Sequence, residues 1–402
     1  MSEGVDVLPV TAPEDVGMSS VRLERLSAAM QGYVDRGEMA GAATLVARRG
    51  KIVHVGSFGM ANIARRDPID PGSIYRIASM TKPITSVAVM MLFEEGRLHL
   101  NDPIAKHLPE LGDAHVLVED DSDAGHHLEP AQASVTVRHL LTHTSGYTYA
   151  ENGPIADAHR ANRVSAGFDN IDDTIGAWTK RLGSVPLLFE PGEGWEYGVS
   201  TDALGRLVEV VSGKALDVFF IERILDPLGM VDTHFFLPPE KVGRLADVYS
   251  WGEGGAPTKV KSDYPYNGPG SLFMGGAGLC STITDYARFC QMMLNGGSLG
   301  SHRLLSRRTV ELMRQNHVGD LDVMAGPGYG FGLGFAVHTD AGASGNVRPV
   351  GTYYWGGYWH TTFWLDPVEE LLAIKMSQVG YPADHLDDHE AFQALVYGAI
   401  AD

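Results

Sequence analysis

Strand-like segments at both ends of the chain, separated by a helical middle, constrain the fold more than any other feature of this sequence. Near the N-terminus, two β-rich runs flank residues 49–51, whose Arg-Gly-Lys sequence predicts a hairpin. Three strand-like segments follow one another at 330–339, 351–366 and 370–379, whereas residues 80–310 are rich in helical patterns. This order predicts one sheet built from both ends of the chain, with a helical domain inserted into it.

Helical segments also flank the predicted strands. Apolar residues recur with a helical period over 19–36, and an apolar helix is expected over 79–95, where Gly96 would end it. A closing helix is expected over 389–401. The 402 residues suffice for two or three domains or one composite unit, and 44% apolar with 20% charged residues is an ordinary globular balance.

The charge balance argues against nucleic-acid and membrane partners. The chain has 31 Lys and Arg against 50 Asp and Glu, a net charge of −19, which repels phosphate backbones and anionic lipids. The longest apolar run, 87–93, is far below the ~20 residues of a membrane span, and the N-terminus lacks the pattern of a secretory signal. Cys280 and Cys290 fit no common zinc or redox spacing. We therefore expect a cytoplasmic protein with two buried, reduced cysteines, and the sequence leaves its oligomeric state open.

A G-x-S-x-G match at 296–300 is a weak candidate for a nucleophile. That motif activates a serine when it stands between a strand and a helix. Here a helix is expected before it, and residues 295–297, Asn-Gly-Gly, are typical of a helix C-terminus. We interpret Ser298 as part of a surface turn.

The stronger nucleophile candidate is Ser79, in the S-x-x-K sequence at the start of the expected helix. Residues three apart share a helical face, so Ser79 Oγ and Lys82 Nζ can meet. The positive potential at a helix N-terminus favours a serine alkoxide and disfavours a protonated lysine. Burial would lower the pKa of Lys82 from its ordinary value near ~10.4, which would let it accept a proton. The pattern predicts a nucleophilic Ser–Lys pair, although a lone S-x-x-K also arises by chance.

Tyr197 is the candidate for a third group, which exchanges a proton with the leaving group. It stands in a Gly-rich loop before an expected helix, where a phenol could project into a cleft. A tyrosine beside a protonated lysine has a lowered pKa and can act as a base. From its position alone, packing as a half-buried aromatic is the more ordinary interpretation.

Several phrases of the sequence resemble landmarks of the class C β-lactamase-like serine hydrolases, in the family's order and over nearly the whole chain. The phrases are RIASMTKPITSVAVMMLFEEGRLHLNDPI, VRHLLTHTSG, PGEGWEYGVSTDALG, GGAGLCSTITDYARF and YWGGYWHTTFWLDP. The similarity is greatest to the esterase branch, the family VIII carboxylesterases, which include 1,4-butanediol diacrylate esterase-like proteins.

The resemblance implies an α/β (α+β) fold of the β-lactamase/penicillin-binding-protein type. Its antiparallel sheet, built from both termini, would have flanking helices, and an all-helical domain would be inserted into it. Residues 1–78 and 315–402 would form the discontinuous α/β domain and residues 79–314 the mainly helical domain. The active site would lie in the cleft between them.

The resemblance also implies roles for the site residues. Ser79 would be the acylated nucleophile, Lys82 its base partner and Tyr197 the other acid/base group. The backbone N–H groups of Ser79 and Tyr358 would form the oxyanion hole, in which the loss of one donor typically lowers the rate ~10²–10³-fold.

Two departures from the class C pattern favour a neutral ester over a β-lactam. Class C β-lactamases carry Tyr-x-Asn at the second motif, where the Asn contacts the substrate amide, and this chain has Val199 at the Asn position. The third motif, Lys-Thr-Gly, is replaced by Trp355-Gly356-Gly357, so the lysine that holds the lactam carboxylate is missing. The two glycines would let their strand approach the acyl group closely.

Aromatic and polar residues near these motifs are candidates for the substrate pocket, although aromatics at such places often pack in the core. The candidates are Tyr147, Tyr149, Val199, Trp355, Gly356, Gly357, Trp359 and His360. His139 and His143 are four residues apart but lack the Glu of H-E-x-x-H, and His385 and His389 stand in an Asp-rich stretch near the closing helix, so we expect no metal at either pair.

Together these observations predict a serine carboxylesterase that hydrolyses neutral, short-acyl esters through an acyl-Ser79 intermediate. No metal or organic cofactor is expected, and the expected partner is a small-molecule ester. β-Lactamase or D-Ala-D-Ala peptidase activity stays open, as does acyl transfer or amide hydrolysis on the same Ser-Lys-Tyr site. A non-catalytic binding protein on this fold would require those three residues to be inert.

Overall fold

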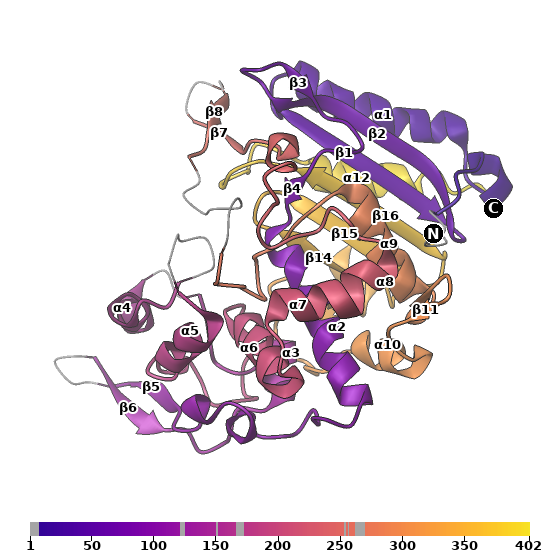
Figure 1. Ribbon diagram of the computed structural model, residues 1–402. Helices are drawn as coiled ribbons and strands as arrows, with labels where there is room; N and C mark the ends of the chain where they lie inside the picture. The colour runs from indigo at the N-terminus through magenta and orange to yellow at the C-terminus, as the bar shows by residue number, and fades with distance from the viewer. Residues whose placement is uncertain are drawn as a thin grey trace.

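An eight-stranded antiparallel sheet joins the two ends of the chain (Figure 1). The computed structural model describes residues 8–120, 125–149, 152–165, 173–252, 255, 257–261 and 270–402. The strand order is β12-β13-β14-β15-β16-β1-β2-β3, so the N-terminal strand β1 lies beside the C-terminal strand β16. Their register places Ala42 opposite Ser377 and Arg48 opposite Leu371. The predicted antiparallel sheet built from both termini is confirmed.

The sheet strands are mostly short. Their bounds are β1 (Gly41–Arg48), β2 (Lys51–Asn62), β3 (Asp67–Pro68), β12 (Tyr329–Phe331), β13 (Ala336–His338), β14 (Tyr353–Gly357), β15 (Thr361–Asp366) and β16 (Leu371–Ser377). Two-stranded ribbons pair β4 (Tyr75–Arg76) with β9 (Cys280–Ser281), β5 (His115–Glu119) with β6 (His126–Pro130), β7 (Tyr249–Trp251) with β8 (Pro257–Lys259), and β10 (Ser298–Leu299) with β11 (His302–Arg303).

The C-terminal part contains five strands where the sequence predicts three. The segment 330–339 turns back between β12 and β13, where Gly332 N–H donates to the Phe335 carbonyl and Gly334 has a φ of +95°. The segment 351–366 also turns, between β14 and β15, because His360 N–H donates to the Gly357 carbonyl. The long runs of aromatic and apolar residues in these segments conceal both turns in the sequence.

Side chains alternate between the two faces of the sheet, and each face packs against helices. Ala42 and Val46 of β1 lie in one apolar cluster with residues of α1 (Ser20–Asp35) and α12 (Asp388–Tyr397). Ala43 and Leu45 of β1 belong to the other apolar cluster, which includes residues of α2 (Thr81–Glu94) and α9 (Ile283–Leu294). The central strand β1 is therefore buried on both faces.

Most of the remaining helices come between β6 and β12 in the sequence. They are α3 (Val137–Thr142), α4 (Gly153–Asn162), α5 (Ile175–Leu182), α6 (Ser200–Ser212), α7 (Leu216–Phe220), α8 (Asp226–Leu228), α10 (Arg307–Met313) and α11 (Ala341–Ser344). A π-helical turn, η5 (Ile221–Leu225), joins α7 to α8. Short 3₁₀ turns are η1 (Pro13–Val16), η2 (Ala78–Met80), η3 (Ile104–Lys106), η4 (Pro109–Leu111) and η6 (Val242–Arg244).

The range 79–314, expected to be mainly helical, also contributes a helix that covers the sheet. Helix α9 lies inside that range, yet it packs against β1, β15 and β16, and the Tyr286 ring lies 5.0 Å from that of Phe363. In Figure 1, α4, α5 and the β5–β6 ribbon lie farthest from the sheet. Over the residues described, no helix combines the length and the apolar character needed to cross a membrane.

Candidate active site

Ser79 and Lys82 lie where the 3₁₀ turn η2 leads into helix α2. Lys82 Nζ is 3.3 Å from Ser79 Oγ, as the three-residue spacing requires. The turn is held from outside, because Ile77 N–H donates to the Leu279 carbonyl and the Tyr286 hydroxyl donates to the Met80 carbonyl. Ala78 has a φ of +42°, an uncommon conformation for a residue with a Cβ, directly before Ser79. The segment therefore presents the serine in a constrained local geometry.

Lys82 is buried, and its nitrogen contacts three oxygen atoms from separate parts of the chain. Besides Ser79 Oγ, Nζ lies 2.8 Å from the Gly276 carbonyl and 3.1 Å from the Tyr149 hydroxyl. Its side chain is 1% exposed. An ammonium has three N–H donors, so these neighbours satisfy it, and a neutral amine here could accept the serine proton.

Asp202, which the sequence analysis did not single out, supports the Lys82 site through Gly276. Its Oδ1 accepts a 2.7 Å hydrogen bond from Gly276 N–H, and the carbonyl of the same glycine holds Lys82. A Cβ at residue 276 would lie 2.6 Å from Asp202 Oδ2, so this approach requires glycine. Burial raises the pKa of Asp202 to about 6, with Lys82 opposing the shift. The available signals were an acidic residue in the first turn of α6 and the Gly275-Gly276 pair.

Tyr197 packs against the Lys82 side of the site. Lys82 Nζ lies 4.5 Å from the centre of the Tyr197 ring. The rings of His143, Tyr149 and Trp355 lie 5.0, 5.3 and 5.3 Å from it. Within the described part of the chain its buried hydroxyl has no hydrogen-bond partner. The phenol is thus fixed by its neighbours while its oxygen remains available to another molecule.

A cavity of about 420 Å³ opens beside these residues. Of the residues proposed from the sequence, it is lined by Ser79, Tyr197, Trp355, Gly356, Gly357, Tyr358 and His360. Lining residues that the sequence analysis missed include Met324, Ala325, Tyr354, Tyr381, Ala383 and His389. Among the described residues that line the cavity there is no Lys, Arg, Asp or Glu. The wall is therefore apolar and aromatic, with two imidazoles and a few hydroxyls as its polar groups.

Four other sequence candidates lie outside this lining. Tyr147 and Val199 are 2% and 0% exposed and belong to the apolar core. The backbones near them pack tightly, since a Cβ at Gly198 would lie 2.3 Å from the Tyr147 carbonyl oxygen. Trp359 is buried in a separate small cluster with Ala78. Tyr149 reaches the site through Lys82 rather than through the cavity wall.

The end of β14 lies against the backbone that precedes Ser79. A Cβ at Gly357 would lie 2.4 Å from the Ile77 carbonyl oxygen, so only glycine permits this approach. Tyr358 follows directly, and its side chain is 48% exposed. The backbone N–H of Tyr358 therefore belongs to the segment that packs against the turn before Ser79.

The weaker candidates lie apart from the cavity lining. Ser298 is in the two-residue strand β10, which follows α9 through a tight turn at Gly296 and Gly297, both with positive φ. His139 caps helix α3 by accepting a hydrogen bond from Thr136 N–H at 3.3 Å. His143 packs beside Tyr197, and burial lowers its pKa well below the ordinary value, with Lys82 adding to the effect.

Comparison with known proteins finds this chain similar to esterases and acyltransferases. The Beta-lactamase family model matches residues 26–397. Esterase EstB of Burkholderia gladioli is 31% identical over 376 residues, 89% of this chain and 90% of EstB. The ML-236A carboxylate methylbutanoyltransferase of Penicillium citrinum is 26% identical over 94% of each chain. The structure of EstCE1, titled a hydrolase with promiscuous acyltransferase activity, superposes with a TM-score of 0.83 at 25% identity, over 94% of this chain and 98% of EstCE1.

Proposed function

Because the chain belongs to the beta-lactamase family of serine hydrolases, we propose that it hydrolyses neutral carboxylic esters with short acyl groups through an acyl-Ser79 intermediate. The observation that carries this proposal is the meeting of Ser79, Lys82 and Tyr197 beside a cavity whose described lining has no charged side chain. A neutral ester loses no ionic solvation on entering such a cavity, whereas a carboxylate would be desolvated without a cationic partner.

The proposed reaction begins when Ser79 Oγ attacks the ester carbonyl and passes its proton to the Lys82–Tyr197 pair. The N–H groups of Ser79 and Tyr358 stabilise the oxyanion of the tetrahedral intermediate. The alcohol leaves with a proton from Tyr197, whose hydroxyl has no partner among the described residues. Water then attacks the acyl-Ser79 ester by the reverse proton path.

The test is parallel kinetics on p-nitrophenyl acetate, butyrate and octanoate and on nitrocefin. We expect ester cleavage to exceed nitrocefin turnover, and Ser79→Ala to lower ester turnover by at least about 10³-fold without loss of the fold. Ser298→Ala is the matched control and should leave the rates unchanged. Faster nitrocefin than ester turnover would identify a β-lactamase instead, and full activity in Ser79→Ala would refute the nucleophile assignment.

Acyl transfer is the second candidate, and it is favoured by the methylbutanoyltransferase and EstCE1 similarities. Transfer uses the same acyl-Ser79 intermediate but ends with an alcohol other than water. Adding increasing concentrations of 1-butanol to the p-nitrophenyl butyrate assay separates the two functions. A hydrolase releases mainly butyrate, whereas a transferase releases mainly butyl butyrate at low alcohol concentration.

A further inference from the structure

A turn of four residues, Gly357 to His360, joins β14 to β15 and carries the N–H of Tyr358. His360 N–H donates to the Gly357 carbonyl at 2.9 Å and closes the turn. His360 has a φ of +68°, a left-handed conformation that residues with a Cβ seldom adopt. Such a conformation persists only where surrounding contacts hold it in place. The contacts of His360 therefore determine the position of this turn.

Two neighbouring elements, α12 and β16, hold His360. Its Nε2 lies 2.7 Å from Oδ1 of Asp388, in the first turn of α12. Its carbonyl accepts a 2.7 Å hydrogen bond from Ser377 Oγ, at the end of β16. The His389 ring stacks on the imidazole with 4.1 Å between ring centres. The preceding residue is also held, because Val379 N–H donates to the Trp359 carbonyl at 3.1 Å.

The carboxylate that receives His360 is itself fixed inside the protein. Asp388 is fully buried, and its Oδ2 forms an ion pair with Lys375, which is also fully buried. Burial alone would raise the pKa of Asp388, but Lys375 and the His360 hydrogen bond lower it well below its usual range. Burial lowers the pKa of His360, with Lys375 adding to the effect, so the imidazole is neutral and donates through Nε2–H. Other titratable groups near this pair include His389, whose pKa burial lowers well below its ordinary value, the largely buried Tyr33, and the exposed His385, Asp387 and Glu390.

The same side chains could in principle hold a cation, since one ligand atom each from His360, Asp388 and His389 lie within 4.8 Å of one another. The Lys375 ammonium argues against this use. It already neutralises the only carboxylate of the group and would repel a divalent cation at the same place. The arrangement is suited to a fixed hydrogen-bond acceptor for the imidazole.

From this geometry we infer that His360 is a positioning residue, which holds the oxyanion-hole N–H of Tyr358 in place through Asp388 and Lys375. The inference rests on the proposed function, because it assigns the purpose of the turn to the oxyanion of acyl transfer. The turn begins at Gly357, which packs against Ile77, two residues before Ser79. A shift of the turn therefore changes the distance between the Tyr358 N–H and the reacting carbonyl. Oxyanion donors act mainly in the transition state, so the loss is expected in kcat more than in KM.

The test compares His360→Asn with His360→Gln. Among residues with a Cβ, Asn adopts the left-handed conformation readily, but its amide is too short to reach the place of the imidazole Nε2. Gln fits that conformation less well, but its amide nitrogen reaches the place of Nε2 and can donate to Asp388. We expect Asn to lower kcat about 10- to 100-fold with KM changed less than about threefold, and Gln to recover kcat to within about fivefold of the wild type. A role limited to backbone conformation predicts the opposite order.

Each variant is assayed with p-nitrophenyl acetate, and kcat is obtained by dividing the maximal rate by the concentration of active sites titrated in the burst. This division removes any loss due to unfolded protein, and melting temperatures are recorded in parallel. Ser377→Ala removes only the hydrogen bond to the His360 carbonyl and should lower kcat about 3- to 10-fold. This variant tests the inference if the His360 variants do not fold. His127→Asn, which removes an imidazole of β6 that contacts Asp120 Oδ2, far from the sheet, is the matched control and should leave kcat per titrated site unchanged.

The inference is overturned if Asn and Gln have equal kcat per titrated site, or if Ser377→Ala has wild-type kcat where the His360 variants cannot be titrated. Loss of activity on dialysis against EDTA, with recovery on adding Zn²⁺, would also overturn it in favour of a metal site. Failure of the proposed function gives a different result, namely a wild-type protein with no Ser79-dependent burst.

Discussion

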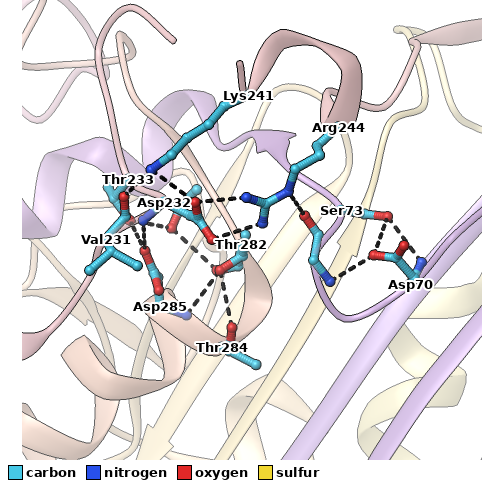
Figure 2. Close-up of polar contacts among 12 residues, drawn as sticks. Asp70, Ser73, Val231, Asp232, Thr233, Lys241, Arg244, Thr282, Thr284 and Asp285 are labelled. Atoms are coloured by element: carbon cyan, nitrogen blue, oxygen red, sulfur yellow. Dashed lines mark hydrogen bonds and ion pairs between the residues drawn. The ribbon is translucent and has the colours of Figure 1, made fainter. Parts of the chain in front are cut away.

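Two buried aspartates with the same perturbation serve two different regions of the molecule. Burial raises the pKa of Asp202, beside Lys82, and of Asp285, in the first turn of α9, to about 6 in each case. Asp285 Oδ2 accepts hydrogen bonds from Asp232 N–H at 2.7 Å and Thr233 Oγ1 at 3.0 Å (Figure 2). Asp202 Oδ2 has no partner within the described residues. The same burial is thus compensated in one region and left partly uncompensated in the other.

The compensated region connects segments that are far apart in the sequence. Asp232 accepts two 2.8 Å hydrogen bonds from Arg244 and lies 3.0 Å from Lys241 Nζ. Arg244 also donates to the Gly72 carbonyl, so the network reaches the chain before β4 (Figure 2). The active site instead leaves Tyr197 Oη and Asp202 Oδ2 without partners in the described chain. The two regions thus differ at these atoms: Asp285 Oδ2 has two donors, whereas Tyr197 Oη and Asp202 Oδ2 have none among the described residues. Removing Asp285 should therefore cost stability, whereas removing the Tyr197 hydroxyl should not.

The largest effect that would sharpen this comparison is expected from Tyr197→Phe. Removing the proposed proton carrier should lower kcat about 10²- to 10⁴-fold. The free energy of unfolding should stay the same or rise slightly, because the lost hydroxyl has no partner in the described structure. Steady-state kinetics with p-nitrophenyl acetate and urea unfolding measure the two quantities. Near-wild-type kcat would place the proton transfer elsewhere.

The opposite pattern, lower stability with unchanged activity, is expected from Asp285→Ala. This substitution leaves the Asp232 N–H without its acceptor and removes one of the two partners of the Thr233 hydroxyl, which still contacts Ser281 Oγ. We expect the free energy of unfolding to fall by about 2–4 kcal/mol, while kcat per titrated active site stays within about twofold. Urea unfolding followed by tryptophan fluorescence gives the first value. A large change in kcat per site with unchanged stability would break the division between the two regions.

A pH experiment tests the perturbation that the two aspartates share. Between about pH 4 and pH 6 the unfolded chain ionises Asp202 while the folded protein keeps it protonated, so stability falls as the pH rises. Asp202→Asn removes this dependence, and its stability relative to the wild type should rise by about 3 kcal/mol between pH 4 and pH 7. Asp285→Asn should show the same drift, since its pKa is raised equally. A flat difference for both variants would show that neither carboxyl is perturbed as described.

The smallest effect is a difference in activity between these two amide variants. Asp202 alone lies within electrostatic range of Lys82 and binds the glycine that holds it. We therefore expect Asp202→Asn to lower kcat several-fold at pH 7 and Asp285→Asn to leave it unchanged. Equal kcat values in both variants would remove Asp202 from the support of the Ser–Lys pair.

Sequence reasoning succeeded where a feature is local. The spacing of Ser79 and Lys82 lies within one helical turn, so their contact follows from helix geometry alone. The sheet was predictable because strand patterns at the two ends of the chain require a partner. The family resemblance supplied Tyr197, which position alone would have assigned to packing.

Other features depend on contacts between distant segments and could not be predicted. Gly276 and Asp202 meet only in the folded chain, and no local pattern marks either as a neighbour of Lys82. Tyr147 and Val199 stand beside motif residues, but their side chains point into the core, a choice made by tertiary packing. The left-handed conformation of His360 is equally invisible, because the residues that contact it, Ser377, Asp388 and His389, come 17 to 29 residues later.

The pairing of β1 with β16 has a consequence for protein synthesis. Ser79 and Lys82 leave the ribosome long before β14, whose Gly357 packs against Ile77 in the turn that carries Ser79. β1 acquires its neighbour β16 only after some 320 further residues have been translated. A growing chain therefore carries the serine without the strand that completes its site until β14 and β16 have been translated.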